Sequence, residues 1–323
     1  MTIRRDLLTA LCALAALPAH PQQRGKVWRI GYLAASSGPE PAVEALREQL
    51  RKLGYVEGRT IAFEYRWAAG REDRVQELAA ELVRLNVDVI VTRTNFVALA
   101  AKRATATIPI VMAGAADPVG AGVIASLGRP GGNVTGVTLN STEIDGKRLQ
   151  LLHEVIPKAT RVATLVWDKS VTKSLFLEQN VAAAKQMGLT LVHQEVGTPE
   201  GLDAAFAAMQ RARAQALVVQ TNPFVSNHVK RILDLAVQHR LPAIYATKGW
   251  MDEGGLMYYG VDARELHRHA ATYIDRLLRG AKPADLPVEQ PTTYELVINL
   301  KTAKALGLVI PQAVLLRADE VIQ

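Results

Sequence analysis

The chain has 323 residues, 49% of them hydrophobic and 21% charged, with a formal net charge of +7. These values are typical of a globular protein of about two domains and exclude a disordered chain. The single cysteine, Cys12, excludes a disulfide-rich scaffold, and the scattered Lys and Arg residues give no sign of nucleic-acid binding.

The first 23 residues have the pattern of a secretory signal peptide. The pair Arg4-Arg5 precedes an apolar run over residues 7–19, which is shorter than the roughly 20 residues needed to span a bilayer. We expect export to the periplasm and cleavage near residues 19–23. The choice between ordinary and twin-arginine export stays open, as does lipidation of Cys12.

Predicted strands and helices alternate from residue 28 to residue 138. The run Val87 to Thr92 is apolar apart from Asp88 and rich in β-branched residues, as in a strand buried on both faces of a parallel sheet. The glycine-rich stretch 128–133 interrupts the alternation, and we expect the strand 134–138 after it to lie in a crossing between two lobes. The expected strands before this stretch are 28–34, 60–67, 87–92 and 109–113, and the expected helices are 41–53, 71–85 and 95–105.

The alternation restarts in the second half of the chain. It predicts the strands 161–167, 190–195, 216–220, 243–246 and 256–260 and the helices 143–156, 174–187, 201–213, 225–239 and 262–279. An extended piece over residues 294–299 and a last helix to about residue 306 follow. Parallel βαβ units on this scale predict an α/β protein with two doubly wound parallel-sheet lobes.

One short pattern occurs once in each half. A buried strand ends in Thr94-Asn95 in the first half and in Thr221-Asn222 in the second, and a helix and a strand opened by proline follow each time. Thr and Asn commonly cap helices, so the repeat can reflect helix capping alone. Alternatively, both pairs line one cleft, because ligands of open α/β sheets bind outside the carboxyl ends of strands. The sequence leaves both interpretations open.

Enzyme and cofactor motifs are absent or incomplete. Residues 120–125 match the dinucleotide pattern G-x-G-x-x-A, but they do not directly follow a strand, and no acidic residue ends a strand about 20 residues later. Residues 170–173 match Ser-x-x-Lys without the partner motifs of that enzyme class. No phosphate-binding loop is present, and the histidines lack zinc-site spacing. We therefore expect no catalytic residue, no metal and no cofactor.

A set of motifs in a fixed order carries a family resemblance. The set comprises Arg29–Leu33, Leu53–Gly58, Ile108–Val111, Asp117–Gly122, Pro130–Val137, Gly280–Glu289 and Leu296–Lys304. It resembles the ABC transporter substrate-binding proteins of the tryptophan/tyrosine-binding type. This resemblance implies a type I periplasmic binding protein fold, in which two lobes joined by a hinge close on one ligand. It also implies a monomer without a DNA-binding domain, which delivers the ligand to a permease and an ATPase that are separate chains.

The resemblance further implies where the lobes and the ligand lie. We expect an N-terminal lobe of residues 28–138 plus 261–286 and a C-terminal lobe of residues 139–260 plus 287–323. The ligand is an amino acid or an aromatic acid, and a periplasmic sensing subunit is the alternative role. The ligand-binding residues expected at strand ends are Ser36, Ser37, Thr94, Asn95, Asp117, Asp168, Lys169, Ser170, Thr221, Asn222, Lys248 and Trp250.

The chemistry of these side chains suits a zwitterion. Hydroxyl and amide groups at helix N-termini can hold a carboxylate. Asp117 or Asp168 can hold an ammonium group, and Trp167 or Trp250 can stack on a ring. For Asp117, formation of a turn before Pro118 is an equal alternative.

Overall fold

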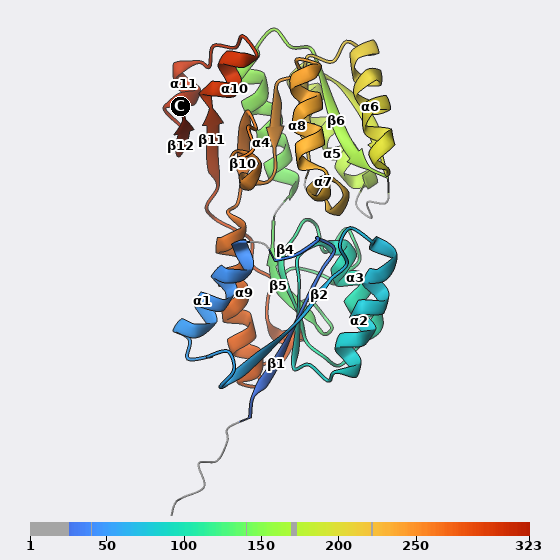
Figure 1. Ribbon diagram of the computed structural model, residues 1–323, viewed down its shortest axis with the longest axis vertical. Helices are drawn as coiled ribbons and strands as arrows, with labels where there is room; N and C mark the ends of the chain where they lie inside the picture. Colours follow the sequence, from blue (N-terminus) through green and yellow to red (C-terminus); the bar gives the residue numbers. More distant parts are fainter. Residues whose placement is uncertain (1–25, 40, 140, 169–172, 221) are drawn as a thin grey trace, which may run out of the picture.

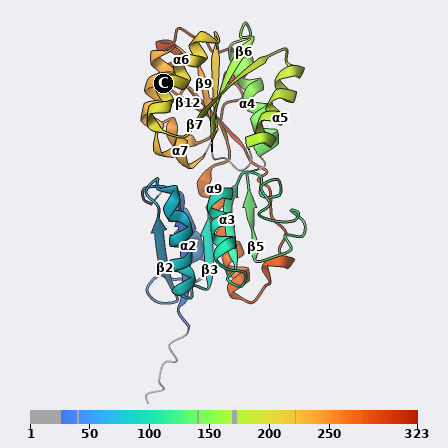
Figure 2. The same ribbon diagram turned by 90° about the vertical axis from the view of Figure 1, so that its right-hand side faces the viewer.

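The computed structural model describes residues 26–323, except residues 40, 140, 169–172 and 221. The chain forms two lobes stacked along the long axis of the molecule, each with helices on both sides of a central sheet (Figures 1 and 2). The expected signal peptide lies outside the described residues. Among the residues that are described, no helix combines the length and the apolar character needed to cross a membrane.

The first lobe is built on a five-stranded parallel sheet of order β2-β1-β3-β4-β5. Its strands are β1 (Trp28–Ala34), β2 (Ile61–Trp67), β3 (Val89–Thr92), β4 (Ile110–Ala115) and β5 (Val134–Thr138).

The strand β5 corrects one expectation. Residues 134–138 do not lie in a crossing between the lobes but form the edge strand of the first sheet, beside β4. All five residues are buried, which explains why this short apolar segment joins the sheet. Gly136, at a φ of +127°, makes the pairing possible, because a Cβ atom there would collide with the backbone of Met112.

A helix from late in the chain completes the first lobe. The helices α1 (Pro41–Lys52) and α9 (Ala263–Leu278) pack together on one face of the sheet, although they lie far apart in the sequence (Figure 1). Leu46 of α1 and Tyr273 of α9 belong to the same buried core as Ile30 of β1. The other face carries α2 (Val75–Arg84), which follows the short helix η1 (Glu72–Arg74), and α3 (Asn95–Ala104).

The second lobe repeats the strand order of the first. Its sheet has the order β12-β11-β10-β9-β8-β6-β7, so β7-β6-β8-β9-β10 corresponds to β2-β1-β3-β4-β5. β11 pairs antiparallel with β10 and parallel with β12. The strands are β6 (Arg161–Trp167), β7 (Thr190–Val196), β8 (Ala216–Val219), β9 (Ala243–Tyr245), β10 (Met257–Gly260), β11 (Glu295–Asn299) and β12 (Glu320–Ile322). The predicted architecture of two doubly wound lobes is confirmed.

Helices cover both faces of the second sheet. Phe206 of α6 and Ile232 of α8 belong to the buried core on one face. Leu152 of α4 and Val314 of α11 belong to the core on the other. The helices are α4 (Ser141–Val155), α5 (Lys173–Gln186), α6 (Pro199–Arg211), α7 (Pro223–Asn227), α8 (Val229–Gln238), η2 (Lys248–Trp250), α10 (Leu300–Ala305) and α11 (Gln312–Leu315).

The chain passes between the lobes after β5, after β10 and before β11. After the short helix η3 (Pro283–Asp285), Val288 is buried in the core of the first lobe and Glu289 forms a parallel bridge with Val137. Contacts with the first lobe therefore continue past residue 286. The expected lobe boundaries themselves stay a prediction.

A buried ion pair lies beside two of these crossings. Arg148 Nη1 is 2.6 Å from Asp145 Oδ1, and Arg148 Nε donates a hydrogen bond to the carbonyl oxygen of Tyr259 at 2.7 Å. Gln220 donates to the other carboxylate oxygen of Asp145 at 3.0 Å. These bonds tie the start of α4 to the end of β10, so the two crossing segments are held together within the second lobe.

Candidate ligand-binding cleft

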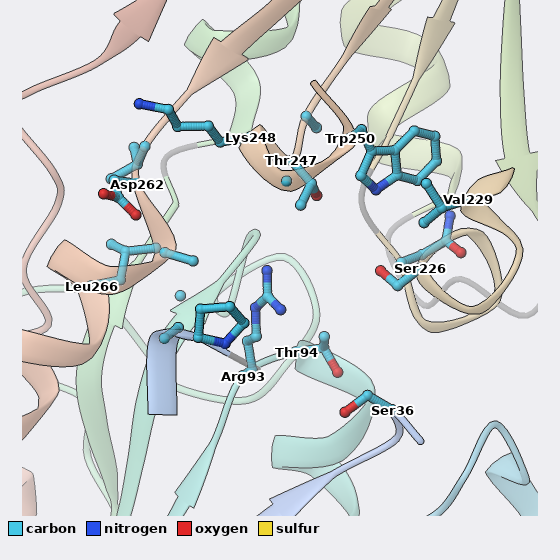
Figure 3. A pocket seen from close by; sticks show the side chains of 18 of the residues that line it. Ser36, Arg93, Thr94, Ser226, Val229, Thr247, Lys248, Trp250, Asp262 and Leu266 are labelled. Carbon is cyan, nitrogen blue, oxygen red and sulfur yellow. The ribbon is translucent and has the colours of Figure 1, made fainter. Parts of the chain in front are cut away.

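A cavity of about 1030 Å³ lies between the lobes. Its walls come from loops that follow strands of both sheets, together with the start of α9 (Figure 3). In each lobe the strand order reverses beside the first strand, and the carboxyl ends of strands at such a reversal are the usual ligand position in α/β sheets. The repeated topology thus places two equivalent ligand positions opposite each other.

Most of the residues expected from the sequence line this cavity. Ser36, Ser37, Thr94, Asn95, Asn222, Lys248 and Trp250 are among its lining residues. Lys169, Ser170 and Thr221 lie outside the described residues, so their placement stays a prediction.

Two of the expected residues do not line the cavity. The carboxylate of Asp117 accepts a hydrogen bond from the backbone N–H of Gly120 at 2.9 Å, which makes Asp117 a turn residue, as the alternative reading held. Asp168 is exposed, and its carboxylate lies against Gly197 beyond the end of β7. The position of a residue at the end of a strand does not show whether its side chain is hydrogen-bonded within its own turn.

The two Thr-Asn pairs begin their helices in different ways. In the first lobe Thr94 is the N-cap of α3, where its hydroxyl accepts from the N–H of Val97 at 3.4 Å, and Asn95 is the first helical residue. In the second lobe Asn222 is the N-cap of α7, and its Oδ1 accepts from the N–H of Val225 at 2.8 Å. The helix starts differ by one residue because Pro223 occupies the first helical position, where proline is favoured.

Asn95 is only 6% exposed and has one half of its amide unpaired. Its Nδ2 donates to the backbone carbonyl of Asp117 at 3.2 Å, whereas its Oδ1 is buried without a hydrogen-bond partner. If the amide were turned over, Oδ1 would face the carbonyl oxygen of Asp117, and neither atom could donate. The contact with Asp117 therefore assigns the nitrogen and the oxygen of the amide. Leaving a buried acceptor without a hydrogen bond costs free energy. A ligand that donates an N–H or O–H group to this oxygen removes that cost.

Aromatic side chains from both lobes form the apolar part of the wall. Phe96 of α3 meets Trp167 of β6 edge to face, with ring centroids 5.6 Å apart and an interplanar angle of 78°. Trp250 packs on Tyr245, with centroids 5.0 Å apart. Phe96, Trp167 and Trp250 all line the cavity. Such surfaces suit a flat apolar group of a ligand.

Charged groups line the same cavity. Lys248 Nζ is 2.9 Å from Glu295 Oε2 and 3.1 Å from Glu320 Oε2. Although partial burial opposes it, these hydrogen bonds raise the pKa of Lys248 above its ordinary value, so the amine stays charged. Arg93 points into the cavity from the first lobe, and Asp262, which pairs with Arg264 at 2.9 Å, borders it from the start of α9 (Figure 3).

Sequence reasoning missed Arg93, Phe96 and Asp262 as lining residues. Arg93 and Phe96 flank the Thr94-Asn95 pair, and Asp262 opens a predicted helix beside a crossing, so a search of neighbouring positions would have found them. Among the described residues, no cluster of three or more His, Cys, Asp or Glu side chains is arranged to hold a metal ion. The mixed apolar and polar lining of the cavity can surround a small molecule that has both apolar and polar parts.

Comparisons with known proteins identify similar chains. The model of a family described as ABC transporter substrate binding protein matches residues 36–322. A curated protein named Tyrosine-binding protein, from Clostridioides difficile (strain R20291), is 27% identical over 279 residues, which cover 86% of this chain and 80% of that protein.

Solved structures show the same likeness. The ABC domain in complex with L-Trp from Streptococcus pneumoniae is 25% identical, with a TM-score of 0.83, over 92% of this chain and 100% of that one. A conserved domain protein from Vibrio cholerae O1 biovar El Tor is 27% identical, with a TM-score of 0.83, over 92% of this chain and 99% of that one.

Proposed function

Because the chain belongs to the family of ABC transporter substrate binding proteins, we propose that it is the ligand-capturing component of an importer. Its ligand is a small organic molecule, either an amino acid or an aromatic acid, held between the two lobes. The observation that carries the proposal is the cavity between the lobes, with aromatic rings and polar groups on its walls. The names of similar proteins, one binding tyrosine and one solved with L-Trp, support this ligand class.

The walls of the cavity suit the two ends of such a ligand. The hydroxyls of Ser36 and Thr94 stand at the N-terminal end of α3, where the helix dipole and free N–H groups favour a carboxylate. Trp167, Trp250 and Phe96 offer flat surfaces for a ring. A ligand bound in this way touches both lobes at once.

Because the ligand contacts both lobes, its binding shifts the equilibrium between the open and closed arrangements of the lobes. A ligand that bridges the lobes favours the closed arrangement by its differential affinity. A micromolar ligand provides about 8 kcal/mol of binding free energy, which is ample to shift a hinge balanced within a few kcal/mol. The permease then recognises the closed form.

The remaining parts of the system follow from this role. The protein acts as a monomer in the periplasm after removal of residues 1–23, and a permease and an ATPase are supplied by separate chains. The lobes divide after residues 138 and 260, and the last division falls beyond the expected residue 286, since Val288 and Glu289 still contact the first lobe. The protein itself carries out no chemical reaction on its ligand.

The test is titration calorimetry of the protein purified from a bacterial periplasm, with the common amino acids and a set of aromatic acids as ligands. We expect at least one aromatic ligand to bind, and Trp250→Ala to weaken that binding at least tenfold, because the indole is a buried wall of the cavity. Trp28→Ala is the matched control, since Trp28 begins β1 and is not a lining residue.

Small-angle scattering with and without the ligand tests closure. We expect a smaller radius of gyration in the bound form. Scattering and melting curves that stay identical with every ligand, or turnover of a ligand by the purified protein, would contradict the proposal.

A further inference from the structure

We infer that Asn95 makes the cavity selective for ligands with an ammonium group over acids that lack one. This role of Asn95 rests on the proposed function and narrows it, because amino acids and aromatic acids otherwise share the carboxylate and the ring. Asn95 acts through its Oδ1 atom, which accepts a hydrogen bond from the ligand.

The first support is the unpaired oxygen itself. Asn95 lines the cavity, is 6% exposed and leaves Oδ1 buried without a partner, while its Nδ2 is held by the carbonyl of Asp117. An amide oxygen only accepts hydrogen bonds, so the ligand must bring the donor. At neutral pH a carboxylate has no hydrogen to donate, whereas an ammonium group has three.

The second support is the position of Asn95 beside the expected carboxylate site. An amino acid carries its carboxylate and its ammonium group on the same carbon, so a carboxylate at the start of α3 brings the ammonium group near Asn95. The positive end of α3 is unfavourable for a cation. A hydrogen bond from the ammonium group to Asn95 Oδ1 offsets this cost.

Acidic side chains also line the cavity. The side chains of Asp252, Glu253, Asp262 and Glu320 line the cavity, against Arg93, Lys248 and Arg264. Arg264 is paired with Asp262, and Lys248 with Glu320. A ligand with a positive group therefore enters a site in which carboxylates are close at hand.

The second lobe supplies an internal comparison. Asn222 lines the same cavity, but its Oδ1 is already engaged by the N–H of Val225. Asn222 therefore has no unpaired oxygen for the ligand. Of the two asparagines that line the cavity, only Asn95 can therefore distinguish ligands by their ammonium group.

The experiment compares two ligands that differ only in the ammonium group, L-phenylalanine and 3-phenylpropionate, by calorimetry. L-Tryptophan and indole-3-propionate form a second pair for a larger ring. We expect the wild type to bind the amino acid of the pair about 100-fold more tightly, because the deaminated acid leaves Oδ1 buried and unpaired. In Asn95→Leu this ratio should fall at least tenfold.

The ratio separates selectivity from structural damage. Loss of the bond to Asp117 or a distorted turn weakens both ligands alike and leaves the ratio unchanged. Asn222→Leu is the matched control, and any loss it causes falls on both ligands equally. The wild-type ratio needs no variant, so equal affinities for the two ligands of a pair would contradict the inference even where Asn95→Leu does not fold.

The outcomes also separate this inference from the proposed function. Equal affinity of the wild type for both members of a pair, or an unchanged ratio in Asn95→Leu, overturns the role of Asn95 while the protein remains a binding protein. Absence of binding by all amino acids and aromatic acids overturns the proposed function itself.

Discussion

The same dipeptide opens equivalent helices in the two lobes, yet its asparagine has a different neighbourhood in each. Asn95 is the first residue of α3 and keeps an unpaired oxygen beside the cavity. Asn222 precedes α7, and its Oδ1 accepts a hydrogen bond from an N–H group at the N-terminus of that helix. A shift of one residue in the helix start therefore separates an asparagine with an unpaired oxygen from one that caps its helix.

The phenylalanines that follow extend the contrast. Counted from the N-caps, Phe96 and Phe224 both occupy the second helical position. Phe224 is 5% exposed and is buried in the core of its own lobe, beside His228. Phe96 instead reaches Trp167 of the other lobe. At equivalent positions, Phe224 thus stabilises the second lobe, whereas Phe96 forms a contact between the two lobes.

The largest expected effect separates the two phenylalanines. Phe224→Ala should lower the free energy of unfolding by about 3–5 kcal/mol, as for other buried phenylalanines. Phe96→Ala should lower it by less, because Phe96 is only half-buried. Denaturant unfolding of both variants measures the difference. An equal loss in the two variants would show that the contact between the lobes is as much part of the fold as the core.

The next effect concerns the cap of α7. Asn222→Ala removes the 2.8 Å hydrogen bond to Val225 and should lower the free energy of unfolding by about 1 kcal/mol in the absence of ligand. The loss should be largely recovered in Asn222→Ser, since serine caps helices about as well. If alanine and serine behave alike, capping is not the role of Asn222.

The smallest effect is expected at the cap of α3. The hydroxyl of Thr94 stands 3.4 Å from the N–H of Val97, which is long for a hydrogen bond. Thr94→Ala should therefore lower the free energy of unfolding by about 0.5 kcal/mol, at the low end for caps. Thermal unfolding of Thr94→Ala and of Asn222→Ala shows which cap contributes more to stability. A larger loss for Thr94→Ala would reverse the ordering on which the comparison rests.

Much of the fold is readable from the sequence. The apolar runs near residues 87–92 and 216–220 predicted the strands Val89–Thr92 and Ala216–Val219, which are buried between two helical layers. The segments with helical spacing predicted the helices between the strands. The segment 134–138 was misread because the glycine-rich stretch before it resembles a crossing. Its parallel pairing with β4, at which Gly136 closely approaches the backbone of Met112, shows that it belongs to the sheet.

The site was less readable, and for a different reason. The rule that ligands lie at strand ends selected positions such as Ser36, Asn95 and Lys248, which line the cavity between the lobes. It could not tell that Asp117 closes its own turn. Nor could it tell which asparagine keeps an unpaired oxygen, since that depends on where each helix starts to the nearest residue.

The return of α9 to the first lobe has a consequence for how the chain folds as it is made. All five strands of the first sheet have been synthesised once residue 138 is complete, but α9, which shares one face of that sheet with α1, ends only at residue 278. During the interval that face lacks the cover of Leu266, Tyr273 and Ile274. Whereas most domains fold in order from the N-terminus, the earlier half of this protein cannot finish its core until most of the later half has been translated.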